Sequence, residues 1–63
     1  MKAVDFFDRS GVHFSVNPAL VAALEACVAE DGEQLGTTIY MNTVFFTVEQ
    51  NIYSVKSSLG WPG

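Results

Sequence analysis

Residues 37–48 read Thr-Thr-Ile-Tyr-Met-Asn-Thr-Val-Phe-Phe-Thr-Val, and they indicate a β-hairpin. The first five and the last five residues of this stretch are mostly β-branched or aromatic, which is typical of strands. Asn42 and Thr43 lie between them, at the place of the turn. Asn accepts a positive φ but Thr resists one, so we expect a turn that is longer than two residues or bulged.

The residues that follow predict one short helix, from residue 52 to residue 59. Asn51 is a favourable N-cap, and Gly60 is the residue type that most often follows a helix end. Ile52, Val55 and Leu59 are spaced so that they form one apolar stripe. The predicted helix therefore has one face that is suited to burial.

The N-terminal part of the chain predicts a second hairpin. Residues 3–7 are mostly apolar, and residues 12–16 alternate between apolar and polar side chains. Such alternation is the period of a half-buried strand. Residues 8–11, Asp-Arg-Ser-Gly, have the composition of a tight turn that joins the two strands.

Residues 19–30 fit two structures. Asn17 and Pro18 favour the start of a helix, and the alanines and leucines that follow have high helix propensity. The same residues also alternate as they would in a short strand that follows one helical turn. Propensity alone favours the helix. Residues 30–36 are mostly polar and contain two glycines, so we expect a loop there.

Several of these features occur together in a known layout. In it a strand ends in Asn-Pro before apolar residues, and the last strand ends in Val before a capped helix that contains Val. The matching positions are Asn17, Pro18, Leu20, Val21, Val48, Asn51 and Val55. Nearly the whole chain thus resembles the FlbD-type small flagellar proteins and similar short bacterial and phage proteins. It departs from them at Tyr53 and Ser54, where the family tends to have acidic residues. The resemblance implies a strand, not a helix, for residues 22–28.

These features together predict one small domain, residues 1–63, of the mainly β (α+β) class. We expect about five short strands in a small twisted antiparallel sheet or a partly open barrel, with one C-terminal helix.

The composition has more apolar material than so short a chain can bury. The 63 residues are 49% apolar and only 16% charged, against a usual charged fraction of about 25%. A domain of this size buries only about 60% of the surface that its unfolded chain exposes. We therefore expect another molecule, most simply a second copy of the chain, to cover part of the surface.

The net charge limits which molecules the protein is expected to bind, and the cysteine content indicates the cellular compartment in which we expect it. The net charge of -4 repels phosphate backbones, so direct nucleic-acid binding is not expected. Cys27 is the only cysteine, which excludes a disulfide within the chain and favours a reducing cytoplasm. No apolar run approaches the ~20 residues of a membrane span. Asp5 and Asp8 interrupt what would be the apolar part of a signal peptide, so none is expected.

The sequence predicts no catalytic residue, no metal site and no cofactor. His13 and Cys27 are the only candidate base and nucleophile, and nothing indicates a third group that would orient them. A buried cysteine that acts as a small apolar side chain explains Cys27 as well. Residues 31–33 have the acids of a calcium loop without its other ligand positions, and no glycine-rich phosphate loop is present.

Candidate binding residues are side chains that we expect to point away from the core. If Val44, Phe46 and Val48 face the core, Phe45 faces outward, and if Ile39 faces the core, Tyr40 faces outward. The predicted binding residues are His13, Tyr40, Phe45, Tyr53 and Trp61. Aromatic side chains concentrate binding energy in contact surfaces. The alternative is that these rings only cover the open ends of a small barrel.

These observations favour a small non-enzymatic binding or regulatory protein that works as a homo-oligomer and contacts a protein partner. The alternative is a phage-type anti-defence protein that inhibits or sequesters a partner or a small nucleotide signal, with aromatic rings that stack on a base. An enzyme would need a site shared between subunits, because so short a chain hardly encloses a pocket.

Overall fold

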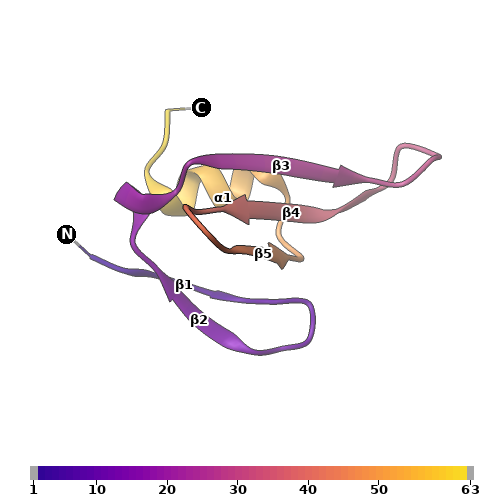
Figure 1. The fold of residues 1–63 in the computed structure, drawn as a ribbon. Helices are drawn as coiled ribbons and strands as arrows, with labels where there is room; N and C mark the ends of the chain where they lie inside the picture. The colour runs from indigo at the N-terminus through magenta and orange to yellow at the C-terminus, as the bar shows by residue number, and fades with distance from the viewer. Residues whose placement is uncertain (1, 63) are drawn as a thin grey trace.

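The computed structural model describes residues 2–62, which form five strands and one α-helix (Figure 1). In chain order the elements are β1 (Val4–Phe7), β2 (His13–Val16), a 3-10 helix (Pro18–Leu20), β3 (Ala23–Val28), β4 (Gln34–Tyr40), β5 (Phe45–Val48) and α1 (Ile52–Leu59). The structure confirms the predicted mainly β class with a C-terminal helix.

The strands form two antiparallel sheets, and within residues 2–62 these sheets do not close into a barrel. One sheet is the β1–β2 hairpin, and the other has the order β3-β4-β5. A single bridge between Asp8 and Val48 connects them, and the Arg9 N–H donates to the Thr47 carbonyl at 3.2 Å. The end of the hairpin is therefore fixed to the edge strand β5.

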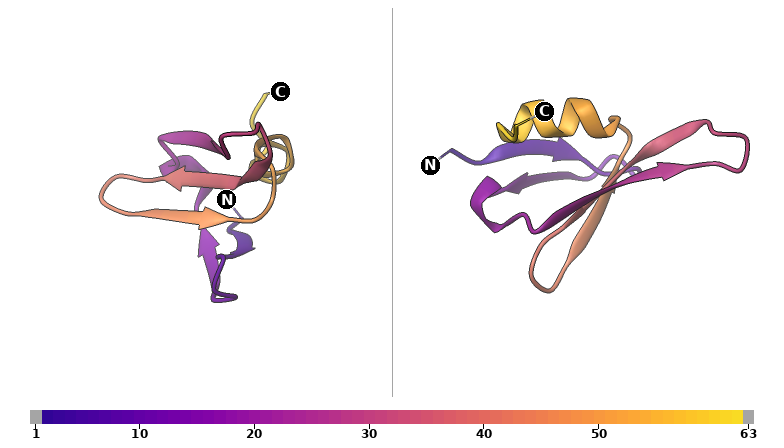
Figure 2. Two further views of the ribbon diagram at one scale, coloured as in Figure 1. Left: turned by 90° about the vertical axis from the view of Figure 1, so that its right-hand side faces the viewer. Right: turned by 90° about the horizontal axis from the view of Figure 1, so that it is seen from above.

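The hydrophobic core lies between the inner faces of the two sheets and α1. Its buried residues are Phe6, Val16, Ile39, Val48, Val55 and Leu59. The Phe14 and Phe46 rings stack beside this core with centroids 4.2 Å apart, so the two sheets contact each other through aromatic side chains. Figure 2 shows the helix against one side of the molecule while β3 and β4 extend beyond it as an arm.

The helix begins and ends as the sequence predicts. The Asn51 side chain accepts a hydrogen bond from the Ser54 N–H at 2.9 Å, which satisfies one of the free donors of the first turn. Gly60 has a φ of 76°, a left-handed conformation that glycine adopts readily at a helix end. Val55 and Leu59 are buried, so the predicted apolar stripe packs into the core.

Within residues 19–30, β3 (Ala23–Val28) is the strand that the family resemblance implies for residues 22–28, and helix propensity alone gives the wrong structure here. Only Pro18–Leu20 are helical, as one 3-10 turn, and β3 follows from Ala23. Leu24 lies opposite Ile39 in the sheet and packs against the core. Pairing with β4 and burial on one face outweigh the propensity of the alanines.

The loop predicted for residues 30–36 is shorter in the structure, because β4 begins at Gln34. The register shifts between Cys27 and Val28, which accommodates the extra residue of a β-bulge. Gly36 lies in this irregular part of β4 with a φ of 129° and closely approaches the Val48 carbonyl. Gly36 therefore marks a close backbone approach within a strand, not a loop.

Two strands begin one residue later than the alternation predicts. Val12 and Val44 precede β2 and β5 and are exposed, although alternation groups each of them with the core-facing residues of its strand. Each lies in a turn, where the alternation of the adjoining strand does not apply. The turn from β4 to β5 spans residues 41–44 and is closed by the Met41 N–H, which donates to the Val44 carbonyl at 2.9 Å. It is therefore longer than two residues, as expected.

We predict that Gly36→Ala lowers the free energy of unfolding by at least about 3 kcal/mol. A Cβ at this position meets the Val48 carbonyl, and φ lies in a region that other residues rarely adopt. Gly32→Ala is the matched control, because Gly32 also has a positive φ but has open space around it. The control should cost only about 1 kcal/mol. Urea unfolding followed by circular dichroism measures both, and equal losses would contradict the prediction.

Candidate functional site

The structure brings together two of the five predicted binding residues. Tyr40 and Phe45 are register partners on β4 and β5, and their ring centroids are 5.8 Å apart. Tyr40 is half-buried, and Phe45 is 65% exposed. His13 lies on the other sheet, Tyr53 lies on the helix, and Trp61 follows the helix. The paired rings make the β3–β4–β5 sheet the main candidate site.

Tyr40 and Phe45 belong to the face of this sheet that points away from the core, which we call the outer face. Alternation and register place seven side chains on it. They are Ala23, Glu25 and Cys27 of β3, Thr38 and Tyr40 of β4, and Phe45 and Thr47 of β5. The helix and the β1–β2 hairpin pack on the opposite, inner face, where Ile39 is buried.

Three short side chains form a row of hydrogen bonds across the outer face. The Thr38 hydroxyl lies 3.2 Å from the Cys27 thiol and 3.1 Å from the Thr47 hydroxyl. Thr38 is only 6% exposed, because its neighbours on this face crowd around it. Cys27 is a free thiol that serves as a partner in this row.

A second polar contact links two neighbouring strands of the outer face diagonally. The Tyr40 hydroxyl donates to Glu25 Oε1 at 2.7 Å. This hydrogen bond, with a smaller contribution from desolvation, raises the pKa of Tyr40 above its usual value. The bond fixes the orientation of the Tyr40 ring beside Phe45 and occupies the only carboxylate on this face.

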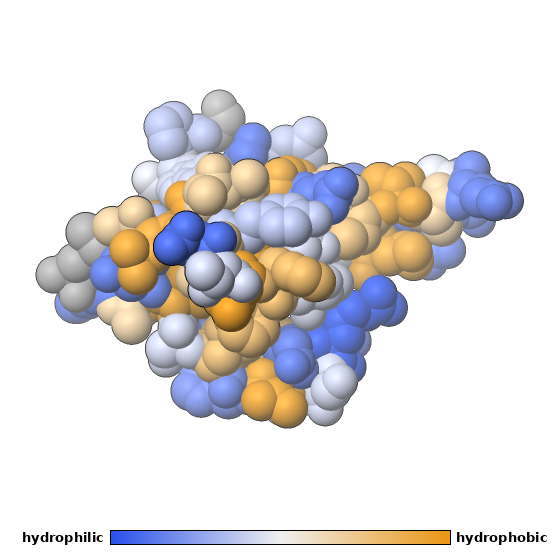
Figure 3. Space-filling model, viewed as in Figure 1, coloured by the Kyte–Doolittle hydropathy of each residue, from blue (hydrophilic) through white to orange (hydrophobic). Residues whose placement is uncertain are grey.

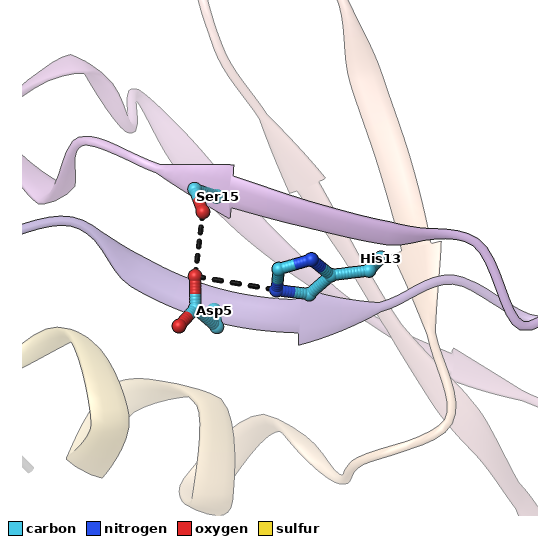
Figure 4. A network of polar contacts seen from close by, with 3 residues as sticks. All are labelled: Asp5, His13 and Ser15. Carbon is cyan, nitrogen blue, oxygen red and sulfur yellow. Dashed lines mark hydrogen bonds and ion pairs between the residues drawn. The ribbon is translucent and has the colours of Figure 1, made fainter.

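His13 belongs to a separate polar cluster on the outward side of the β1–β2 hairpin (Figure 4). Asp5 accepts a hydrogen bond from the Ser15 hydroxyl, and His13 Nε2 lies 3.4 Å from Asp5 Oδ1. The Ser15 hydrogen bond is the main reason that the pKa of Asp5 is lowered. The Phe7 ring lies over the His13 ring with centroids 5.2 Å apart.

This cluster contains the residue types of a hydrolytic triad in an arrangement that does not activate the serine. In a triad the imidazole lies between the hydroxyl and the carboxylate and accepts the hydroxyl proton. Here Asp5 lies in the middle and both Ser15 and His13 contact it. The Ser15 hydroxyl donates to a carboxylate, so the cluster orients side chains but does not prepare a nucleophile.

A pocket lies where the turn of the hairpin meets the end of β5. Its volume is about 340 Å³, and it is lined by Phe7, Asp8, Arg9, Gly11, Glu49 and Gln50. Asp8 Oδ1 accepts hydrogen bonds from the N–H groups of Ser10 and Val12, so this carboxylate holds the turn. The pocket therefore lies where the two sheets meet. Its lining includes the acidic side chains of Asp8 and Glu49 and the basic side chain of Arg9.

The other two predicted binding residues have different surroundings. Tyr53 is exposed on the helix, with Lys56 Nζ 5.9 Å from the centre of its ring. Trp61 packs against the hydrophobic core, so its ring extends the core beyond the helix end. Trp61 is therefore only partly exposed, and its role in binding stays a prediction.

Within residues 2–62 the structure does not bring together the candidate metal ligands or the His13–Cys27 pair. Residues 2–62 contain no group of three metal-binding side chains. His13 and Cys27 lie on different sheets, and each has a partner of its own. None of the helices described is long and apolar enough to cross a membrane.

Comparison with known proteins leaves the geometry as the main guide to function. The chain matches no protein-family model, no curated protein and no solved structure. The resemblance to FlbD-type proteins therefore stays a prediction.

Sequence reasoning missed the polar partners of the site. Glu25, Thr38 and Thr47 could be placed beside Tyr40 only with the strand register. Their spacing of two along each strand is a visible signal, but the bulge next to Cys27 hides which residues lie opposite one another. Asp5 and Ser15 were missed for the same reason, since they are ten residues apart in the chain.

We predict that Glu25→Ala lowers the pKa of Tyr40 towards its ordinary value of about 10. The variant removes the hydrogen bond and the nearby negative charge that raise this pKa. In a Tyr53→Phe background Tyr40 is the only tyrosine, so ultraviolet absorbance against pH follows it alone. Glu49→Ala is the control and should leave the titration unchanged.

The sign of the linked stability follows from the same shift. Folding raises the pKa of Tyr40, so the contribution is present below pH ~10 and is lost as pH rises through the folded-state pKa. A Tyr40 titration that does not respond to Glu25→Ala would show that the hydrogen bond does not form in solution.

Proposed function

We propose that this chain is a small non-enzymatic binding or regulatory protein that acts as a homo-oligomer. The observation that supports the proposal is the exposed apolar surface of a very small domain. The large hydrophobic residues that are exposed are Phe7, Val12, Leu20, Val28, Leu35, Val44, Phe45 and Tyr53. They outnumber the buried residues of the core.

The surface area supports the same proposal. The chain exposes 4310 Å², whereas a compact monomer of 6.9 kDa exposes about 4000 Å². The excess is modest, but it occurs together with exposed aromatic side chains. Association of copies would bury apolar area that the small core leaves in water, and this is a common way in which such short chains gain stability.

Charge supports a protein partner in preference to nucleic acid. The net charge of -4 is unfavourable for binding a phosphate backbone. A basic protein segment would be attracted to the acidic parts of the surface. The single cysteine favours a reducing compartment such as the cytoplasm, and this location is part of the proposal.

We predict that the protein sediments as a species larger than 6.9 kDa at tens of micromolar concentration and dissociates on dilution. Thermal unfolding should shift to higher temperature as concentration rises, because association stabilises only the folded state. Analytical ultracentrifugation and concentration-dependent melting measure the two effects. A folded monomer at every concentration would exclude the homo-oligomer.

The alternative function, sequestration of a small nucleotide signal by an anti-defence protein, has support from one feature. The Tyr40 and Phe45 rings lie together on an open face, and paired rings of this kind can stack on a base. Glu25 beside them offers a carboxylate that can accept a hydrogen bond from a base edge.

A nucleotide that binds this face should raise the melting temperature of the wild-type protein, and Phe45→Ala should abolish the rise. Cyclic and linear nucleotides are the probes, measured by differential scanning fluorimetry. Phe7→Ala, which removes a similarly exposed ring from the other sheet, is the matched control. If no nucleotide shifts the melting temperature of the wild type, this alternative is rejected.

A further inference from the structure

Strand β3 forms one edge of its sheet. The order β3-β4-β5 pairs β3 on one side, and within residues 2–62 no strand pairs with its other side. In an edge strand, every second residue directs its N–H and C=O groups away from the sheet, where a further strand can bind them. In the right-hand view of Figure 2, from above, α1 lies beside the sheet and not over the edge of β3.

The other strand edges are less suited to pairing. At the opposite edge of the same sheet, β5 is bridged to the hairpin through Asp8 and Val48, and the Arg9 N–H donates to the Thr47 carbonyl. Strands β1 and β2 have four residues each, whereas β3 (Ala23–Val28) has six. A longer edge offers more backbone hydrogen bonds to an added strand, so β3 is the best candidate.

Strand β3 lacks the features that commonly protect an edge from pairing. Natural edge strands carry lysine or proline, or are interrupted by a bulge. The sequence of β3, Ala-Leu-Glu-Ala-Cys-Val, contains neither lysine nor proline, and its only charged residue is Glu25. The bulge lies at the end of the strand, between Cys27 and Val28. The edge is therefore regular over residues 23–27.

The side chains of β3 indicate which residues an added strand would carry. Side chains that lie opposite each other on neighbouring strands interact, and opposite charges attract. Glu25 is exposed on the outer face, where the Tyr40 hydroxyl holds its Oε1, and its second oxygen can accept a hydrogen bond from a basic group. Leu24 and Ala26 are half-buried on the inner face, so apolar side chains fit beside them.

Exposed apolar surface near the end of β3 favours the same kind of segment. Figure 3 shows apolar residues along the β3–β4 arm and strongly hydrophilic residues at its tip. Val28, the last residue of β3, is 53% exposed. An added strand can cover this side chain, and burial of apolar area is favourable. The net charge of -4 attracts a basic segment towards this surface.

We propose that the edge of β3 binds an extended segment of a partner protein, in which apolar and basic side chains alternate, as an added strand of the sheet. Backbone hydrogen bonds to β3 supply the affinity, and Glu25 selects a basic side chain. This inference rests on the protein partner of the proposed function and names the surface that binds it. It does not depend on the homo-oligomer.

The test titrates the wild-type protein with a blocked peptide of about seven residues, long enough to span β3, in which valine and lysine alternate. Nuclear magnetic resonance should show amide shifts concentrated in β3 and slower hydrogen exchange of its outward N–H groups. The same peptide with every backbone nitrogen methylated cannot donate hydrogen bonds and should not bind. A peptide with glutamate in place of lysine should bind roughly tenfold more weakly.

A matched pair of variants tests the role of Glu25. Glu25→Gln keeps an acceptor for the Tyr40 hydroxyl but removes the charge, and it should weaken binding of the lysine peptide about threefold at low salt. Glu49→Gln removes the same charge beyond the end of β5 and should change the affinity much less. Circular dichroism shows whether both variants remain folded.

Three results would overturn the proposed edge: no binding of the lysine peptide, equal binding of its methylated form, or shifts confined to another surface. Shifts in β3 that grow with protein concentration in the absence of peptide would assign this edge to a second copy of the chain, which also overturns the proposal. Sedimentation decides the homo-oligomer separately, so the two proposals can fail independently.

Discussion

The structure depends on the packing of one face of a three-stranded sheet. Ile39 in the central strand β4 is fully buried, with Leu24 and Phe46 opposite it on the neighbouring strands. The helix supplies Val55 and Leu59 to this side of the sheet, and the β1–β2 hairpin supplies Phe6 and Val16. Within residues 2–62 no helix or strand packs on the opposite, outer face, so that face stays open.

The open face can remain exposed to water because it carries polar side chains, several of which hydrogen-bond to one another. Thr38, Cys27 and Thr47 lower the apolar content of the face, and their mutual hydrogen bonds hold the side chains in one arrangement. The same bonds lower the cost of dehydrating these three side chains, whereas the Glu25 carboxylate on this face is costly to remove from water.

Much of the fold follows from the sequence, and the exceptions have physical causes. Asn51 and Gly60 mark the helix ends correctly, because capping is a local interaction. Residues 23–28 form a strand against their propensity, because pairing with β4 is a long-range interaction that no local window contains. The site was predicted only in part for the same reason. Alternation identifies Tyr40 and Phe45 as outward rings, but only the register across the bulge places Glu25 and Thr38 beside them.

The position of Trp61 gives the protein an intrinsic optical reporter. It is the only tryptophan, and its indole packs against the core on the side of the molecule opposite the open sheet face. Its emission spectrum is therefore sensitive to the loss of the core and insensitive to contacts made on the far side of the sheet. Fluorescence of the unmodified chain can thus separate unfolding from assembly without an added label.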